Sequence, residues 1–399
     1  MDPVKAQYEA YPYPARDPAD EAKRLIEGSP SHPAEIDHFV FAGKRDWSKP
    51  FRALVAGGGT GDGLIMLAQK LADRGTPAEI TYLDMSTASR EIAEARAAAR
   101  GLTSISFITG DLLTAPDHGP FDYIDCTGVL HHLPEPQAGF DALGAALADG
   151  GGLGAMVYAP HGRTGVYPMQ GALRALTEGE APEDQVAVAK DVLKALPRTN
   201  WFPQNRFIGD HKVSDAGLYD LLLHSRDRPY EVRDVVEAAK AAGLNFLSFT
   251  EPGRYDPRRY LPDALHERAS ALDPVTQAEV AERLAGNMKV HVFYAGKNAP
   301  GVAGISPEAR PRLNGINAKA LGGEIKRKGV LKIDSDGLKH SLKITPAAGD
   351  LIMLADGRMR LGEIAKAKGM DWIAFAAAWK PAHEALIGFN LMRYSEGMR

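Results

Sequence analysis

Between residues 51 and 160, short apolar runs alternate with longer Ala- and Leu-rich runs, and this alternation constrains the fold more than any other feature of the chain. The short runs have the length and composition of buried strands, and the longer runs have the length of helices. The short runs lie at 51–57, 78–84, 104–110, 121–128 and 151–159, and the longer ones at 62–75, 86–101 and 136–150. Such repetition predicts a doubly wound α/β domain, in which a mostly parallel sheet carries helices on both faces.

The alternation stops at residues 161–228 and then resumes. A helical run covers 231–244, and strand-like runs cover 244–251 and 289–297, with helical sequence at 261–286 between them. We therefore expect residues 1–299 to form one domain. Within it, residues 1–50 form an N-terminal cap and residues 161–228 form a helical insert.

A Pro-, Gly- and Ala-rich stretch at 298–311 is typical of a linker, so residues 300–399 are expected to form a second, smaller domain. Strand-like runs at 329–334 and 341–345 precede helical runs at 348–357, 360–369 and 371–392. Pro381 should kink or split the last of these helices. Short helices with a few strands predict a small α+β unit of the winged-helix type.

The composition is that of a globular protein. The hydrophobic share is 44% and the charged share is 25%, both ordinary values for such chains. No stretch approaches the roughly 20 apolar residues of a membrane helix, and the first residues lack the apolar run of a secretory signal. Cys126 is the only cysteine of the sequence, so no disulfide can form within the chain. We expect a cytoplasmic protein without a membrane partner.

The charge gives no general case for a nucleic-acid partner. The net charge is −4, but the last 99 residues carry 16 Lys and Arg against 10 Asp and Glu, whereas the preceding 300 carry 31 against 41. The mildly basic tail leaves nucleic-acid binding open, although a solvated charged face is the simpler interpretation. A homo-oligomer also stays open.

A glycine-rich turn, LVAGGGTGDG at residues 54–63, joins the first predicted strand to the helix after it. Gly57, Gly59 and Gly61 permit a tight turn and let a ligand approach the backbone, with helix N-terminal amides facing it. Asp84 ends the next strand, 23 residues after Gly61, and Asp111 ends the third. Because ligands bind at the carboxyl ends of parallel strands, this pattern predicts a nucleotide-like ligand whose ribose contacts Asp84.

The turn does not fit a dinucleotide or a nucleoside triphosphate. The fingerprint G-x-G-x-x-G is broken, since counting from Gly57 places Asp62 in its last position, and counting from Gly59 places Leu64 there. No G-x-x-x-x-G-K-[ST] motif is present either. A nicotinamide-dependent oxidoreductase is therefore disfavoured.

These elements resemble the class I S-adenosylmethionine-dependent methyltransferases, most clearly over residues 50–160. LVAGGGTG is similar to the first motif of that family, LDMS to the second, TGDL to the third and FDYIDCTGVLHHLPEP to the fourth. The resemblance implies that Asp84 holds the ribose and that Asp111 meets the adenine amino group, with Leu112 beside the ring. The cofactor-binding residues that it implies are Gly57, Gly59, Gly61, Asp84, Met85, Asp111, Leu112 and Thr127.

One position departs from the family pattern. The family usually has an acidic residue two places before the first motif glycine, where this chain has Val55. That residue helps to organise the contact with the methionine amino group of the cofactor. Backbone carbonyls around Gly57 and the side chain of Thr127 could take its place.

The acceptor side of the site is less well defined, because methyl transfer needs alignment and exclusion of water more than a fixed catalytic group. His131 and Tyr158 follow the fourth and fifth strands, and both are candidates for catalysis and for lining the acceptor pocket. A structural histidine is an equally good interpretation of His131. In the segment YEAYPYP, Tyr11 and Tyr13 could fold over the ligand or pack on the surface.

The insert is both aromatic and polar, which suits the wall of an acceptor pocket. Trp201, Tyr219 and Arg226 are its predicted lining residues, and His211 is a further catalytic candidate. A dimer or domain contact is the competing interpretation. We predict no metal site, since the spacing of the insert histidines matches no tight ligand motif.

We therefore predict a methyltransferase whose acceptor, a small organic molecule or a protein side chain, cannot be identified from these patterns. The tail segment GDLIMLADGRMRLGEIA resembles the winged-helix-like appendices of some bacterial methyltransferases, including relatives of protein lysine methyltransferases. The alternative is a regulatory protein that binds the cofactor and docks on DNA or protein through this tail.

Overall fold

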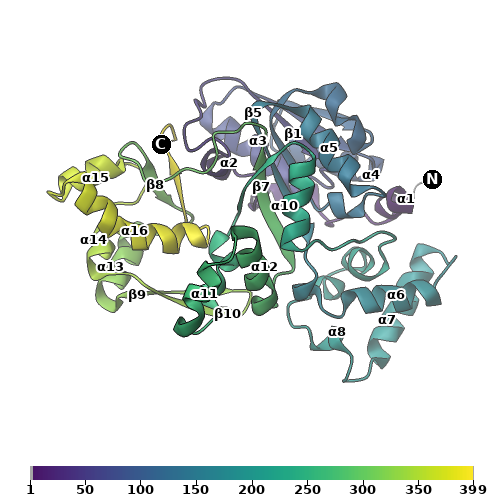
Figure 1. The fold of residues 1–399 in the computed structure, drawn as a ribbon. Helices are drawn as coiled ribbons and strands as arrows, with labels where there is room; N and C mark the ends of the chain where they lie inside the picture. The colour runs from purple at the N-terminus through teal and green to yellow at the C-terminus, as the bar shows by residue number, and fades with distance from the viewer. Residues whose placement is uncertain (1–2, 399) are drawn as a thin grey trace.

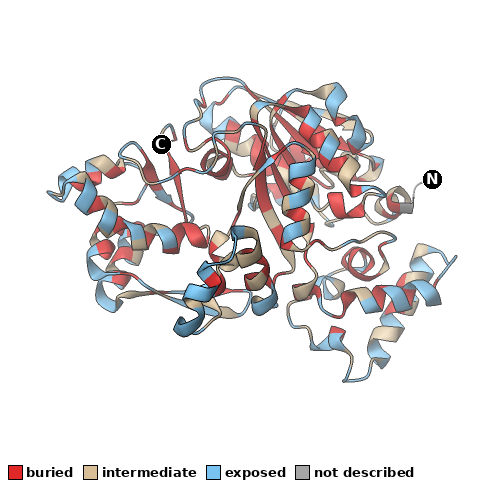
Figure 2. Cartoon of the chain, in the orientation of Figure 1, coloured by how far each residue is buried: buried red, intermediate tan, exposed pale blue. Residues whose placement is uncertain are grey.

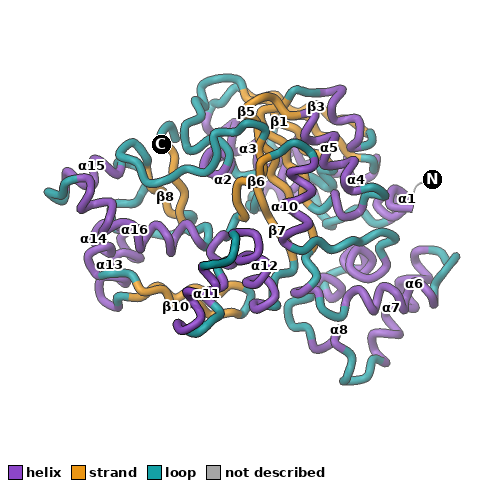
Figure 3. Tube along the Cα trace, viewed as in Figure 1, coloured by secondary structure: helices purple, strands orange, loops and turns teal. Residues whose placement is uncertain are grey.

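A seven-stranded sheet forms the centre of the computed structural model, which describes residues 3–398 (Figures 1 and 3). The strand order is β3-β2-β1-β4-β5-β7-β6. All neighbouring strands are parallel except β7, which runs antiparallel to both β5 and β6. The strands are β1 (Phe51–Ala56), β2 (Ala78–Asp84), β3 (Ile105–Thr109), β4 (Phe121–Thr127), β5 (Leu147–Tyr158), β6 (Asn245–Phe249) and β7 (Val290–Gly296). The predicted doubly wound, mostly parallel sheet is confirmed.

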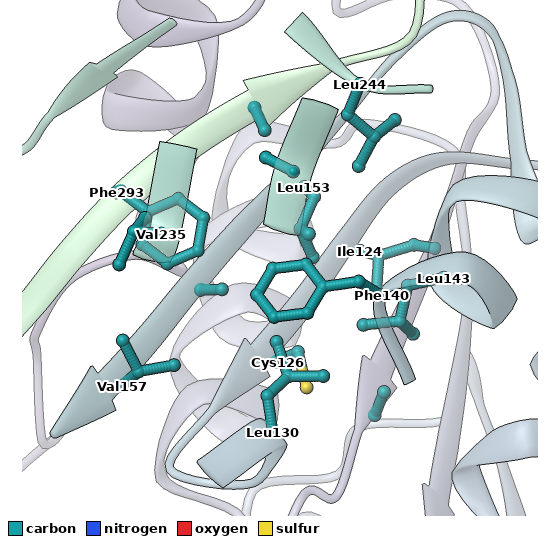
Figure 4. Close-up of a cluster of buried hydrophobic side chains, with 14 of the residues drawn as sticks. Ile124, Cys126, Leu130, Phe140, Leu143, Leu153, Val157, Val235, Leu244 and Phe293 are labelled. Carbon is teal, nitrogen blue, oxygen red and sulfur yellow. The ribbon is translucent and has the colours of Figure 1, made fainter. Parts of the chain in front are cut away.

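Helices cover both faces of this sheet, and each face has its own apolar core. One core joins the strands to α2 (Pro33–Phe39), α3 (Asp62–Arg74) and α4 (Thr87–Ala99). The other joins them to α5 (Pro136–Ala146) and α10 (Val232–Ala241). In Figure 4, Phe140 and Leu143 of α5 point at Ile124 and Cys126 of β4, so the single cysteine is a buried packing residue.

Two predicted helices have different boundaries in the structure. The helix predicted over 136–150 ends at Ala146, and β5 begins at Leu147, because Leu147 pairs with Phe121 of β4 before the register shifts. The helix predicted over 261–286 divides into α11 (His266–Ser270) and α12 (Pro274–Ala285). The Asp273 carboxylate accepts the Val275 and Thr276 amides and so caps a new helix, with Pro274 in its first turn.

The insert folds as a helical unit with a small core of its own, centred on Leu173, Phe202 and Leu221. It lies below α1 (Pro3–Ala10) in Figure 1, on the side of the molecule away from the C-terminal residues. Its helices are α6 (Val166–Leu176), α7 (Pro182–Ala195), α8 (Trp201–Gln204), α9 (Asp215–Leu218) and a π-helical turn, η6 (Tyr219–Leu223).

The C-terminal residues build another core around Phe375 and Trp379 (Figure 2). Their helices are α13 (Ala318–Lys328), α14 (Pro346–Ile352), α15 (Leu361–Ala367) and α16 (Trp372–Gly388). Their strands form two separate pairs, β9 (Val330–Ser335) with β10 (Leu338–Lys343), and β8 (Arg310–Leu313) with β11 (Met392–Ser395). Pro381 does not split α16, which continues through it. Among residues 3–398, no helix combines the length and apolar character needed to cross a bilayer.

Strand β11 attaches the C-terminal part to α2. The Tyr394 amide donates to His38 Nδ1 at 3.2 Å, and the Ser395 hydroxyl donates to Asp37 at 2.5 Å. Arg393 forms an ion pair with the fully buried Glu35 at 3.3 Å. Buried polar groups with partners on both sides fix one arrangement of the two parts.

Candidate functional site

The glycine turn between β1 and α3 is shaped by contacts that only glycine tolerates. Gly57, Gly59 and Gly61 have φ values of 67°, 50° and 97°, in the left-handed region that favours glycine. A Cβ atom on Gly57 would lie 2.3 Å from the side chain of Val129, and one on Gly59 would lie 3.0 Å from the Tyr13 carbonyl oxygen. The turn therefore brings the loop after β4 and the N-terminal cap against the start of α3.

Asp84 is bound directly to this turn from the end of β2. Its Oδ2 accepts the Gly59 amide and its Oδ1 accepts the Ser86 amide, both at 2.8 Å. Asp84 is only 9% exposed, and burial raises the pKa of its carboxyl group, while the two amide hydrogen bonds oppose that shift. Each oxygen keeps a second lone pair that ribose hydroxyl groups can use.

The other residues predicted to bind adenosine lie at the same edge of the sheet. Met85, half-buried, follows Asp84. The exposed Asp111 follows β3, and its Oδ1 accepts the Leu113 amide at 2.9 Å, whereas Leu112 is buried. The bare glycine turn lets a ligand approach the backbone closely. The carboxylate held beside it suits the ribose of an adenosine, and the apolar side chain next to the second carboxylate suits the adenine. The residues present therefore fit the cofactor.

An acidic residue on the neighbouring strand lies level with the position where the first motif usually has one. Val55 of β1 pairs in register with Asp125 of β4. The buried Asp125 carboxylate accepts the Thr127 hydroxyl at 2.6 Å and the Ser31 hydroxyl, and a Cβ on Gly63 in the first turn of α3 would lie 2.6 Å from it. Thr127, predicted to contact the cofactor, is thus held by Asp125. Sequence reasoning missed Asp125, because one acidic residue inside a strand gives no local signal.

The N-terminal cap covers the cofactor elements through polar contacts. Glu9 accepts the Thr87 and Ala88 amides at the start of α4. The Thr60 hydroxyl donates to the Pro14 carbonyl oxygen at 2.7 Å, and Arg16 forms an ion pair with Asp62 at 2.6 Å. The cap therefore contacts both the glycine turn and the helix that follows Asp84.

A buried carboxylate, Asp220 in the π-helical turn η6, lies where the cap, the insert and β5 meet. Its Oδ1 accepts the Tyr8 hydroxyl at 3.2 Å and its Oδ2 accepts the Tyr158 hydroxyl at 2.9 Å. Burial raises the pKa of Asp220. Burial raises the pKa of the Tyr13 phenol, and a Cβ atom on Gly59 would lie 3.0 Å from the Tyr13 carbonyl oxygen. The predicted residue Tyr158 is thus bound to an acid that the sequence did not reveal.

Two stacked histidines complete this cluster, and the backbone of Arg226 forms a hydrogen bond with each of them. The rings of His132 and His224 lie 3.6 Å apart. His132 Nδ1 donates to the Arg226 carbonyl oxygen at 2.6 Å, and the Arg226 amide donates to His224 Nδ1 at 3.0 Å. His132 therefore keeps a lone pair on Nε2, whereas His224 carries its proton on Nε2. His132 Nε2 is buried and has no hydrogen-bond partner among residues 3–398.

His132, Asp220 and His224 offer ligand atoms within 4.8 Å of one another, which is close enough to hold a metal ion. A ligating nitrogen must present its lone pair to the ion. The lone pair of His224 faces the Arg226 amide instead. Asp220 and His132 Nε2 suit a group that donates hydrogen bonds better than a metal ion, and a metal-free site stays our prediction.

An open groove of about 480 Å³ lies next to this cluster, with His131 in its lining. The His131 ring is 1% exposed and lies 4.0 Å from the ring of Tyr158, and burial holds its pKa well below the usual range. Arg226, predicted to line the acceptor pocket, lines this groove too. Beneath Tyr158, Arg163 stacks on the phenol at 3.7 Å and pairs with Asp227 at 2.8 Å.

The remaining predicted residues lie in the cap and elsewhere in the insert. Tyr11 stacks on Tyr219 at 5.4 Å, which joins the cap to the insert. Trp201 is 66% exposed, and His211 packs against Phe202 at 4.9 Å; neither residue lines the groove. Within residues 3–398, no contact of Trp201 or His211 with Asp220, His132 or His224 (together the acceptor cluster) is seen, and the roles of Trp201 and His211 remain predictions.

The strand order and the glycine turn define a methyltransferase fold, and a family profile described as "Methyltransferase domain" matches residues 54–153. The chain therefore contains a class I S-adenosylmethionine-dependent methyltransferase domain. Its activity is therefore methyl transfer, and its cofactor is S-adenosylmethionine.

Among proteins similar to this chain, an uncharacterised protein from Synechococcus sp. is 30% identical over 305 residues, which cover 74% of this chain and 71% of that protein. PKMT2 from Rickettsia typhi has a similar structure, with TM-scores of 0.64 alone and 0.65 in complex with AdoHcy. It is 14% identical, and the match covers 92% of this chain and 76% of that one. The shared fold therefore extends well beyond the methyltransferase sheet.

Proposed function

We propose that the enzyme methylates an amine nitrogen, and that the amine is a lysine side chain of a polypeptide. The observation that carries this proposal is the buried Asp220, which lies beside His132 Nε2 and between the phenols of Tyr8 and Tyr158. An ammonium group donates up to three hydrogen bonds and is attracted to carboxylates and aromatic faces. Asp220, the His132 lone pair and the two phenols offer it these partners.

The same cluster can prepare the amine for reaction. An amine attacks only after losing a proton, and burial lowers the pKa of an ammonium group as it lowers those of His132 and His224. His132 Nε2 accepts this proton, while Asp220 and Tyr158 hold the nitrogen in place. The bound cofactor supplies an electrophilic methyl group on a sulfonium. The N–C bond forms as the C–S bond breaks, and the electron pair of that bond stays on sulfur as a neutral thioether.

The choice of a polypeptide acceptor is supported by the overall architecture. PKMT2, by its name a protein lysine methyltransferase, shares the fold over the sheet, the insert and the C-terminal part. A surface groove lined by His131 also lies next to this cluster, since the His131 ring is 4.0 Å from the ring of Tyr158, and an open groove suits a polypeptide main chain.

We further propose that residues 1–299 form the catalytic domain, with cap 1–50 and insert 161–228, and that residues 300–399 form a docking module. Separate apolar cores in the two parts support this division. The module carries two short strand pairs and four helices among residues 300–398. We propose that this module acts as a winged-helix-like appendix that binds a protein substrate.

A peptide panel tests the proposed acceptor. Peptides that contain one Lys, His, Ser, Cys or Glu in a common background are incubated with the enzyme and cofactor, and methylation is read by mass spectrometry. We expect methylation on lysine. Asp220→Asn should lower kcat/KM about 10- to 100-fold, the size of a lost hydrogen bond to a charged group, while cofactor affinity is retained. Asp215→Asn, an exposed acid in the same insert, is the matched control. Methylation on another side chain, or an unaffected Asp220→Asn enzyme, would contradict the proposal.

A further inference from the structure

The groove beside the acceptor cluster carries an excess of positive charge. Arg174, Arg226 and Arg228 line it, together with Glu135 and Asp227. The Asp227 carboxylate is already neutralised, because it pairs with the buried Arg163 and accepts the Gln170 amide, both at 2.8 Å. Arg174 and Arg228 are exposed and form no ion pair with any of residues 3–398. Arg174 and Arg228 therefore give the groove two exposed cations beside the single acid Glu135.

The wall of this groove is also the scaffold of the acceptor cluster. The backbone of Arg226 holds both His132 and His224, and the Arg228 amide donates to the His131 carbonyl oxygen at 3.1 Å. Buried His131 has no hydrogen-bond partner on either ring nitrogen within residues 3–398, and its ring separates the groove from Tyr158. A ligand in the groove would thus lie next to the nitrogen being methylated.

We propose that this groove binds an acidic polypeptide segment, so that the enzyme selects lysines flanked by aspartate or glutamate. The inference rests on the proposed function and names its substrate class more closely. Guanidinium groups bind carboxylates with paired hydrogen bonds. Arg174 comes from the last turn of α6, whereas Arg226 and Arg228 come from the connection to α10, so the charges line both the insert side and the sheet side. Charges spread along an open groove suit a chain with several carboxylates better than a single small acid.

Binding is tested first, without methylation. A fluorescein-labelled Glu-rich peptide without lysine is titrated with the enzyme by anisotropy, next to a peptide in which Gln replaces every Glu. We expect the Glu peptide to bind at least 10-fold more tightly, with an affinity that falls as salt rises. Arg174→Glu/Arg228→Glu should abolish that preference. The matched control is Lys194→Glu/Arg198→Glu, which makes the same charge change at exposed positions outside the groove.

Methylation is then compared on lysine peptides with Glu or Gln flanks. The wild type should prefer Glu flanks by kcat/KM, and the groove variant should lose or reverse the preference. Equal binding of the Glu and Gln peptides would overturn the proposal. Displacement of the labelled Glu peptide by free glutamate as effectively as by unlabelled peptide would also overturn it. If the Glu peptide binds in the groove but no lysine peptide is methylated, the docking site holds and the amine acceptor is wrong.

Discussion

Asp125 of β4 is the register partner of Val55 of β1, so the carboxylate absent from the first strand is present at the same level on the next one. It is 2% exposed, and hydroxyls of Ser31 and Thr127 point at it. Its closeness to Gly63 places it beneath the first turn of α3, where a negative charge is favourable. We therefore infer that Asp125 positions the first turn of α3 and the side chain of Thr127.

Replacing this carboxylate should weaken cofactor binding. Asp125→Asn keeps the shape but removes the charge, and we expect an about 10-fold rise in the Kd for S-adenosylmethionine, corresponding to ~1.4 kcal/mol. Calorimetric titration measures the change. Rescue by Asp125→Glu would show that the charge matters, whereas an unchanged Kd for Asp125→Asn would refute this role.

Asp84 should matter more directly, through the ribose. Asp84→Ala removes acceptors for the ribose hydroxyls as well as a partner of the Gly59 amide. We expect a loss of about 1–3 kcal/mol in cofactor binding free energy, measured by the same titration. Glu79→Ala on the same strand, whose side chain is 79% exposed, is the control and should bind as the wild type does. Equal affinities of the two variants would contradict the assignment of Asp84.

The ion pair of Arg16 with Asp62 should keep the cap closed. Arg16→Ala removes a guanidinium whose Nε donates to Asp62 Oδ1 and whose Nη2 donates to Asp62 Oδ2. We expect cofactor dissociation to become several-fold faster. Stopped-flow displacement measures this rate, and limited proteolysis should cut the cap sooner. Lys23→Ala removes an exposed ion pair with Asp20 from the same segment and should change neither readout. A cap variant with wild-type dissociation would show that the segment does not retain the cofactor.

The contact between α2 and β11 should make the protein sensitive to acid. Burial lowers the pKa values of His32 and His38 to about 3. Since unfolded histidine titrates near 6.5, each contributes stability that is complete above that pH and is lost as the pH falls toward 3. Burial raises the pKa of Asp37 to about 6, so this carboxyl group favours the folded state as the pH falls. It opposes the effect of the histidines, but it is one group against two.

His32→Asn isolates this effect, because His32 caps α2 by accepting the Ala34 amide and asparagine can do the same without titrating. We expect the variant to match the wild-type Tm at pH 7.5 and to lose less of it by pH 5. Thermal unfolding at a series of pH values provides the measurement. Parallel curves for the two proteins would exclude His32 as a source of the acid sensitivity.

The sheet and the cofactor edge were predictable because their signals are local. The alternation of apolar runs sets the strands, and glycines with an acid 23 residues later mark one crevice. The start of β5 was less clear, since residues 147–150 (LADG) have helical composition and only the pairing of Leu147 with β4 makes this segment a strand.

The acceptor cluster could not be predicted, because its partners are distant in the sequence. Tyr8 and Asp220 are 212 residues apart, and no periodicity connects them. Asp220 stands in the run YDLLL, where an acid next to buried leucines is a weak sign of a special environment. The lone pair of His132 depends on a backbone carbonyl 94 residues away.

Tyr8 belongs to the cap, yet its hydroxyl donates to Asp220, while the neighbouring Glu9 anchors the same helix over the residues that follow Asp84. One closing movement would therefore both retain the cofactor and finish the acceptor site. We expect a compulsory order of addition, with S-adenosylmethionine entering before the peptide and the methylated peptide leaving before the spent cofactor.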